Sequence, residues 1–175
     1  MSEHNTGGSV DTDILQVKNH LLALKQIDFE LAYLALLTYL DIKPLSRWEK
    51  PLADKELGRL RAMNLLVKQI TRTVKSGEKI IENIFSHSQA YIRMYEQYFG
   101  NTEIKKNAQS QRFEGFLFGY PPCCIEQYIR KPYAPNNLEE KEQKILFHWA
   151  CKNCGITPFI LLCYKSVFEQ IENLP

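Results

Sequence analysis

The first 122 residues of this chain contain no cysteine, and all five cysteines fall in the last third of its 175 residues. Cysteines crowded into one part of a chain are more typical of a metal site or a reactive thiol than of a disulfide network. Disulfides are also unnecessary for stability, because 45% of the residues are hydrophobic and a chain of this length can bury a core of ordinary size.

The chain also lacks the long apolar run of a membrane span. Its most apolar window, residues 29–40, covers about 12 residues, whereas a spanning helix needs roughly 20. The first ten residues are polar and include Gly7 and Gly8, without the basic start and apolar run of a signal peptide. We therefore expect a disordered tail over residues 1–10, no membrane partner and a cytosolic protein.

A strong excess of charge of either sign is absent. The chain has 22 basic and 20 acidic residues and a net charge of +2, which is too small to indicate a nucleic-acid partner by itself. Four basic residues recur at helical spacing and could follow a phosphate backbone: Arg61, Lys68, Arg72 and Lys75. A solvated helix face is the favoured interpretation, and a helical interaction module that binds nucleic acid is the minor alternative.

The spacing of the apolar residues predicts an all-α fold, a single-domain irregular helical bundle over residues 11–175. Asp28 is suited to cap a buried helix over residues 29–40, and residues 53–74 are expected to form one long helix. Residues 80–85 and 91–99 fit two further helices. A polar link over residues 102–111 divides a helical scaffold (11–101) from a cysteine-bearing subregion (112–175).

The first cysteine pair follows a proline-rich turn, Gly119-Tyr120-Pro121-Pro122. Pro122 fits the first turn of a helix, so Cys123 and Cys124 are expected at that helix start, Cys124 nearer the buried side and Cys123 nearer the solvent.

The second cysteine pair is Cys151 and Cys154, preceded by His148 at the same spacing of three. A capping-box pattern at Asn137 and Glu140 predicts a helix over residues 138–154, with all three residues on its last turns. Because the negative end of a helix dipole disfavours a reactive thiolate and suits a bound cation, this placement favours a metal.

The metal ligands are therefore expected among Cys123, Cys124, His148, Cys151 and Cys154. Three ligands from His148, Cys151 and Cys154 with one from the first pair would give a three-cysteine, one-histidine zinc site. An all-cysteine set could hold zinc or, less favoured, an iron-sulfur cluster. Cys163 fits the apolar face of a final helix, together with Phe159 and Val167, and is expected in the core.

A thiol-dependent enzyme is the main alternative. Cys123 or Cys124 would then act as a nucleophile activated by the helix start, with His148 as a base. The sequence has no glycine-rich phosphate loop, HExxH or GxSxG pattern that would indicate another chemistry.

The segment from Phe116 to Tyr128 resembles the uncharacterised archaeal and bacterial proteins of domain-of-unknown-function family 483, which carry a GYPxCC motif and a downstream histidine and cysteines. The resemblance covers roughly residues 75–165 and implies that the motif and the downstream residues form one site. It implies no activity, substrate or cofactor.

Overall fold

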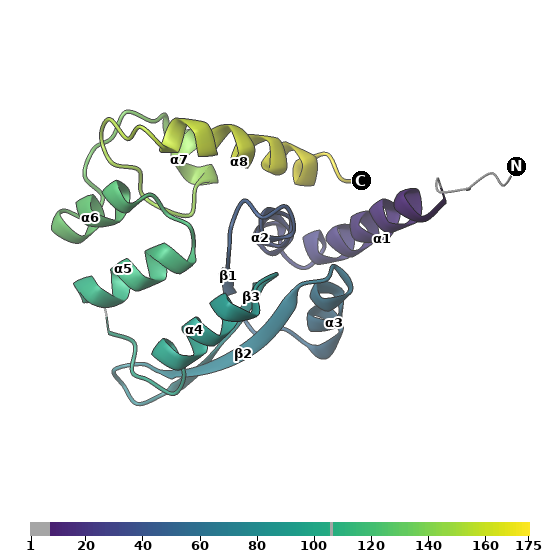
Figure 1. Ribbon diagram of the computed structural model, residues 1–175, viewed down its shortest axis with the longest axis horizontal. Coiled ribbons are helices and arrows are strands. Elements are labelled where there is room, and N and C mark those ends of the chain that lie inside the picture. The colour runs from purple at the N-terminus through teal and green to yellow at the C-terminus, as the bar shows by residue number, and fades with distance from the viewer. Residues whose placement is uncertain (1–7, 106) are drawn as a thin grey trace, which may run out of the picture.

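The computed structural model describes residues 8–105 and 107–175, and it combines helices with a three-stranded antiparallel sheet (Figure 1). The predicted tail at residues 1–7 lies outside the described residues, and residues 8–10 belong to the first helix. The elements are, in chain order, α1 (Gly8–Lys25), α2 (Phe29–Tyr39), β1 (Ser46–Trp48), α3 (Asp54–Ala62), β2 (Leu66–Thr73), β3 (Lys79–Ser86), α4 (Gln89–Phe99), α5 (Ala108–Leu117), α6 (Pro122–Arg130), α7 (Glu140–Ile145) and α8 (Thr157–Glu172).

The sheet shows that the prediction of an all-α bundle is wrong, and that the fold is mixed α and β. Its strand order is β1-β3-β2, so β3 lies in the centre and pairs antiparallel with both neighbours. The expected long helix over residues 53–74 is instead helix α3 followed by strand β2. Asn64 separates them with a φ of 59°, a left-handed conformation that ends a helix.

Two features of its sequence made strand β2 difficult to predict. Val67, Ile70 and Val74 are spaced by three and four, which matches a helix and breaks the alternation expected of a strand. Its buried positions are Ile70 and Arg72, so a charged residue occupies one position of the inward-facing alternation. The β-branched residues of this segment nevertheless favour a strand.

Strand β3 takes the place of the helix expected over residues 80–85. It pairs with β2 along its whole length, from Leu66 opposite Ser86 to Thr73 opposite Lys79. Gly77 makes the connecting turn with a φ of 86°, which glycine adopts without steric cost. Glu82 and Asn83 are buried on this strand. Because these buried residues are polar, the sequence again lacks the alternation of apolar and polar residues that indicates a strand.

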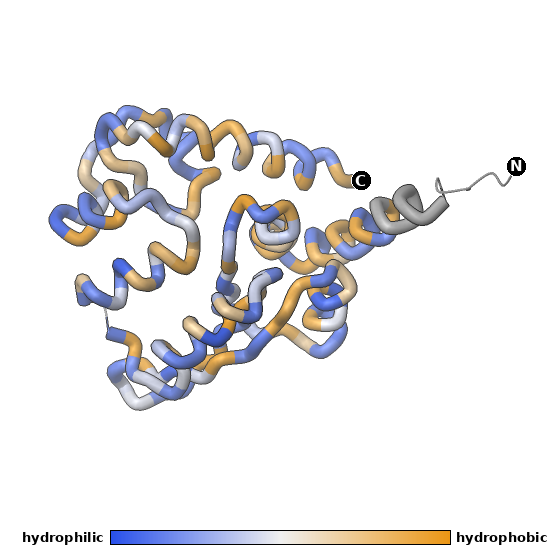
Figure 2. Tube along the Cα trace, viewed as in Figure 1, coloured by the Kyte–Doolittle hydropathy of each residue, from blue (hydrophilic) through white to orange (hydrophobic). Residues whose placement is uncertain are grey.

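Helix α2 is buried in the larger core, and the prediction of a buried helix capped by Asp28 is confirmed. Its N-cap is Asp28, whose carboxylate accepts a hydrogen bond from the Glu30 backbone N–H at 2.9 Å. Eight successive residues, Leu31 to Thr38, are buried, because α2 packs against α1, α8 and the sheet. In Figure 1 it is seen nearly end-on between α8 and the strands. Figure 2 shows hydrophobic and hydrophilic residues interspersed along most helices, as amphipathic packing requires.

A second, smaller core joins the sheet to α4 and α5. It includes Ile84 from β3, Tyr95 and Phe99 from α4, and Leu117 from α5. Helix α4 ends at Phe99 with Gly100 as its C-cap, which agrees with the predicted helix over residues 91–99. The division between scaffold and cysteine-bearing subregion stays a prediction, although α5 already begins within the expected link.

The helix expected over residues 138–154 is much shorter than predicted. Helix α7 spans only Glu140–Ile145, and the chain is irregular from Leu146 to Ile156, where α8 follows. The Gln143 side chain explains the change of direction, because its amide donates to the His148 carbonyl oxygen at 2.8 Å and accepts from the Ala150 N–H at 3.2 Å. The helical steps that would have set His148, Cys151 and Cys154 on one helix therefore do not occur.

Candidate metal centre

Helix α6 holds the first cysteine pair in its first turn. Pro122 is the first helical residue, as predicted, and Cys123 and Cys124 follow it directly. Cys124 is buried and Cys123 is exposed, so the predicted orientation of the pair is confirmed. Gly119 makes the tight approach to this helix with a φ of 72°.

The loop between α7 and α8 holds the second pair. Cys151 and Cys154 are both partly buried, and the Cys154 N–H donates to the Cys151 carbonyl oxygen at 3.3 Å. Asn153 between them has a φ of 59°, which turns the backbone sharply. This turn replaces the helical geometry that the spacing of three suggested.

The two pairs meet in space. The sulfurs of Cys123, Cys124, Cys151 and Cys154 all lie within 4.8 Å of one another. Cys154 Sγ lies 3.4 Å from Cys123 Sγ and 3.5 Å from Cys124 Sγ, well beyond the roughly 2.05 Å of a disulfide bond. Four thiolates around one zinc ion would be separated by about 3.8 Å, because Zn–S bonds are about 2.3 Å. The cluster can therefore hold a metal ion.

Hydrogen-bond donors surround these sulfurs. The Cys151 N–H donates to Cys124 Sγ at 3.3 Å, and the Thr157 N–H donates to Cys154 Sγ at 3.3 Å. The Thr157 hydroxyl donates to Cys154 Sγ as well, at 3.2 Å. Such donors reduce the negative charge that builds up when several thiolates share one ion, and they fix the sulfur positions.

The thiols differ in acidity. Burial raises the pKa of the Cys151 thiol to about 11 and that of the Cys124 thiol further still. Burial also acts to raise the pKa of Cys154, but the hydrogen bonds from the Thr157 hydroxyl, the Thr157 N–H and the Ile156 N–H outweigh it and lower this pKa to about 6. A metal that binds all four sulfurs must therefore displace protons, most of all from Cys124 and Cys151.

His148 is not among the four clustered ligands. Its Nε2 atom lies 3.2 Å from the Thr157 hydroxyl oxygen, so Thr157 stands between the ring and the sulfurs. Burial, reinforced by the positive charge of Lys43, lowers the pKa of His148 to about 4. The Thr157 hydroxyl donates its proton to Cys154 and can therefore only accept from His148. The neutral His148 ring is accordingly assigned the tautomer with the proton on Nε2, which donates to the Thr157 oxygen.

Cys163 is exposed on α8, which corrects the prediction that it is a core residue. Phe159, expected on the same apolar face, is 73% exposed. The buried face of α8 is instead formed by Leu161, Tyr164, Val167 and Ile171. Both sets of residues have helical spacing, and the positions of α2, α7 and α1 against α8 decide which set is covered.

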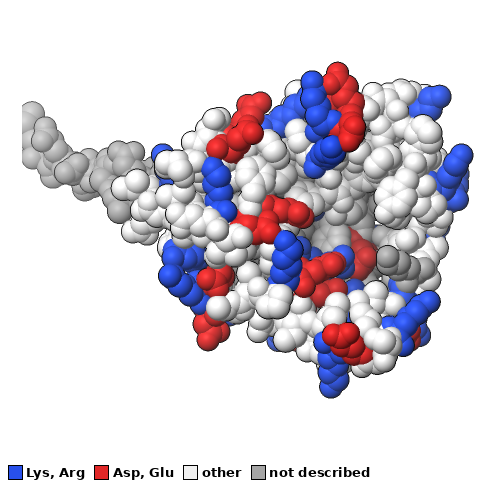
Figure 3. All heavy atoms as spheres, turned by 180° about the vertical axis from the view of Figure 1, so that it is seen from behind, with Lys and Arg blue, Asp and Glu red and all other residues white. Residues whose placement is uncertain are grey.

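A large cavity borders the candidate metal centre. It has a volume of about 1190 Å³, and its lining includes Cys124, Tyr120 and His148 as well as Arg47, Arg72 and Glu114. From behind, Figure 3 shows a hollowed face with acidic and basic side chains around it. Cavities of this size with a few convergent polar groups are typical ligand sites.

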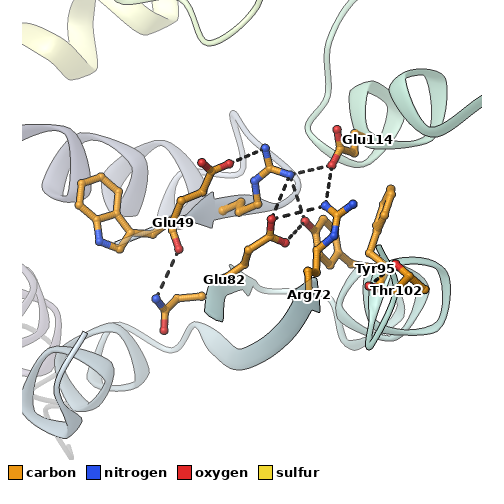
Figure 4. Close-up of polar contacts among 10 residues, drawn as sticks. Glu49, Arg72, Glu82, Tyr95, Thr102 and Glu114 are labelled. Carbon is orange, nitrogen blue, oxygen red and sulfur yellow. Dashed lines mark hydrogen bonds and ion pairs between the residues drawn. The ribbon is translucent and has the colours of Figure 1, made fainter. Parts of the chain in front are cut away.

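A buried ion network forms part of the cavity wall, and sequence analysis did not identify it. Arg72 on β2 donates to Glu82 on β3 at 3.4 Å and to Glu114 on α5 at 3.2 Å, while Tyr95 donates to Glu82 at 2.6 Å (Figure 4). Arg47 on β1 donates to the same Glu114 oxygen at 2.7 Å. Most of these residues lie far apart in sequence, and the sheet pairing together with the positions of α4 and α5 brings them into contact.

The basic stripe predicted on one helix does not form. Arg61 lies on α3, whereas Lys68 and Arg72 lie on β2 and Lys75 follows that strand. Arg72 is buried within the ion network, and Lys68 pairs with Glu96 at 3.0 Å. A nucleic-acid partner stays a prediction without this helical face to support it.

No protein-family model, curated protein or solved structure matches this chain. The resemblance to the GYPxCC proteins therefore stays a prediction. Across the described ranges, no helix has the length and apolar character needed to cross a membrane.

Proposed function

We propose that this is a zinc protein in which Cys123, Cys124, Cys151 and Cys154 hold one Zn²⁺ ion that ties the start of α6 to the loop before α8. The observation that carries the proposal is the approach of four sulfurs from two distant segments to within 4.8 Å. Zinc sites with four protein ligands are closed and stabilise folds rather than catalyse reactions. The zinc would therefore be structural.

The compactness of the cluster favours one ion over an iron-sulfur cluster. An iron-sulfur cluster distributes its four thiolates over several irons and contains sulfides between them, so it requires more widely separated sulfurs. The spread of at most 4.8 Å fits ligands that share a single tetrahedral ion better.

The surroundings of the cluster support a structural role as well. The loop that carries Cys151 and Cys154 contains little regular secondary structure, and α7 is only six residues long. Such a segment has few backbone hydrogen bonds of its own to fix it. A metal that joins it to α6 would order it, because metal-binding free energy becomes folding free energy when the site forms only in the folded chain.

The proposal is tested by elemental analysis and thiol titration of protein purified without an affinity tag. We expect one zinc per chain and one readily titrated thiol, that of the exposed Cys163. All five cysteines should become reactive after addition of a chelator and denaturant. Protein without metal and with five reactive thiols would overturn the proposal, and iron with visible absorption would replace zinc by a cluster.

Two serine variants provide a matched comparison. Cys154→Ser removes a clustered ligand and should abolish stoichiometric zinc and lower the melting temperature. Cys163→Ser removes an exposed thiol outside the cluster and should leave both zinc content and melting temperature unchanged while removing the titrated thiol.

A further inference from the structure

Lys43 is a buried lysine at the end of the turn that follows α2. Only 2% of its surface is exposed, and no carboxylate among the described residues forms an ion pair with its ammonium group. Within the part of the chain that the structure describes, its side chain makes one hydrogen bond, from Nζ to the Phe118 carbonyl oxygen at 3.2 Å. Lysine is almost never buried in this way without a charged partner, because the cost of desolvating the ammonium is high.

Three aromatic rings surround the Lys43 nitrogen instead of acidic groups. Nζ lies 4.8 Å from the ring centre of Tyr120, 5.3 Å from that of Phe147 and 5.4 Å from that of Phe118. Phe118 and Tyr120 directly follow α5, and Phe147 lies in the loop after α7. Rings from these two segments surround the amine of a third segment, the turn after α2.

The same lysine lines a cavity of about 310 Å³. Phe118, Tyr120, Phe147 and Arg47 also line this cavity and contribute to the wall of the larger one beside the metal centre. A volume at the lower end of the range for ligand sites admits a molecule of a few heavy atoms. Lys43 is thus buried and yet lines a space that a small reactant can occupy.

The environment of Lys43 matches the two ways in which proteins activate a lysine as a nucleophile, which are desolvation and a neighbouring cation. Burial and, to a smaller extent, the positive charge of Arg47 lower the pKa of Lys43 to about 7. A substantial fraction of the amine is then neutral near pH 7 and carries a free lone pair.

We propose that Lys43 is a nucleophilic amine that forms an imine with a small aldehyde or ketone in this cavity. The neutral Nζ adds its lone pair to the carbonyl carbon, and one proton passes from Nζ to the carbonyl oxygen to give a carbinolamine. The carbinolamine then loses its hydroxyl group and the second Nζ proton as one molecule of water. A C=N bond replaces the C=O bond, no electron is gained or lost, and the water leaves to solvent.

The proposal is tested by reductive trapping on the wild-type protein with its metal bound. Acetaldehyde and sodium cyanoborohydride at pH 7 should convert Lys43 to N-ethyl-lysine, which peptide mass spectrometry locates. Lys50 serves as an internal control, because it lines the same cavity but is largely exposed, and its hydrogen bond to Asp28 raises its pKa. Lys43 should react at least about tenfold faster than Lys50, since far more of it is neutral at this pH.

Modification that is no faster at Lys43 than at Lys50, or absent at Lys43, would overturn the proposal. The variant Lys43→Arg keeps the positive charge but cannot form the imine, so its rapid trapping should disappear while slow labelling of exposed lysines continues. Because the measurement maps sites on the wild-type chain, it holds even if a variant folds poorly. Its outcome is independent of which metal the cysteines bind.

Discussion

The Thr157 hydroxyl donates a hydrogen bond to Cys154 Sγ at 3.2 Å, and the Thr157 backbone N–H donates to the same sulfur at 3.3 Å. Thr157 begins α8, so the helix that packs on α2 also positions one of the four candidate ligands. Thr157 thereby connects the core with the candidate metal centre.

Replacing Thr157 by valine should therefore weaken zinc binding. The change keeps the shape of the buried side chain and removes the hydroxyl donor, and we expect a loss of about 10- to 100-fold in zinc affinity. Competition with a chromophoric chelator measures it. Thr157→Ser keeps the hydroxyl and should remain close to wild type, and equal affinities of the valine variant and wild type would contradict this role.

Replacing His148 should leave zinc in place. The ring contacts Thr157 rather than joining the cluster, so His148→Gln is expected to retain one zinc per chain. Cys151→Ser, by contrast, removes a clustered sulfur, and this variant should lose its zinc. Zinc content of the purified His148→Gln variant distinguishes the all-cysteine site, which keeps its zinc, from one with three cysteines and His148, in which both variants would lose zinc.

Glu82→Gln should be strongly destabilising. Glu82 is buried and compensates Arg72, which is also buried, so the variant leaves a guanidinium without its full charge partner. We expect a loss of about 3–5 kcal/mol in the free energy of unfolding, measured by urea denaturation. Glu140→Gln breaks an exposed pair with Lys144 and should leave the free energy of unfolding almost unchanged, because water screens such a pair.

Two glycine variants should change the stability of the fold in opposite directions. Gly119 has a φ of 72°, and an added Cβ would lie 2.7 Å from Pro44 Cδ, so Gly119→Ala should destabilise by more than about 1 kcal/mol. Gly58 lies within α3 with no atom within 4 Å of an added Cβ, and Gly58→Ala should stabilise by about 0.5–1 kcal/mol. Thermal melting of both variants checks the pair.

Lys43→Met should stabilise the fold at pH 7 by about 1–4 kcal/mol, because it removes a buried charge that lacks a carboxylate partner. The folded pKa of Lys43, about 7, lies below its ordinary value of 10.5, so the unfolded chain binds more protons between these pH values. Wild-type stability contributed by this residue therefore rises from pH 7 to about 10. Denaturation at several pH values should show the advantage of the methionine variant shrinking over this range, and a constant difference would argue against the shifted pKa.

Much of the local structure was predictable from short sequence patterns. The Asp28 cap, the buried α2, the start of α6 at Pro122 and the orientation of Cys123 and Cys124 follow from rules that involve only neighbouring residues. The strands were not predictable in this way. Arg72 and Glu82 occupy buried positions, where apolar residues would have marked the alternation of a strand. The length of α7 was also not predictable, because the Gln143 side chain forms a hydrogen bond with the loop that follows this helix.

The sequence by itself determined which atoms are available for chemistry, namely the two cysteine pairs with Cys123 and Cys124 at a helix start. The tertiary structure decided that all four sulfurs converge, that His148 lies behind Thr157 and that Cys163 faces solvent. It also placed Lys43 among three rings from distant segments. The physical reason is that spacing along the chain fixes side-chain direction only within one element, whereas distances between elements depend on how their buried faces pack.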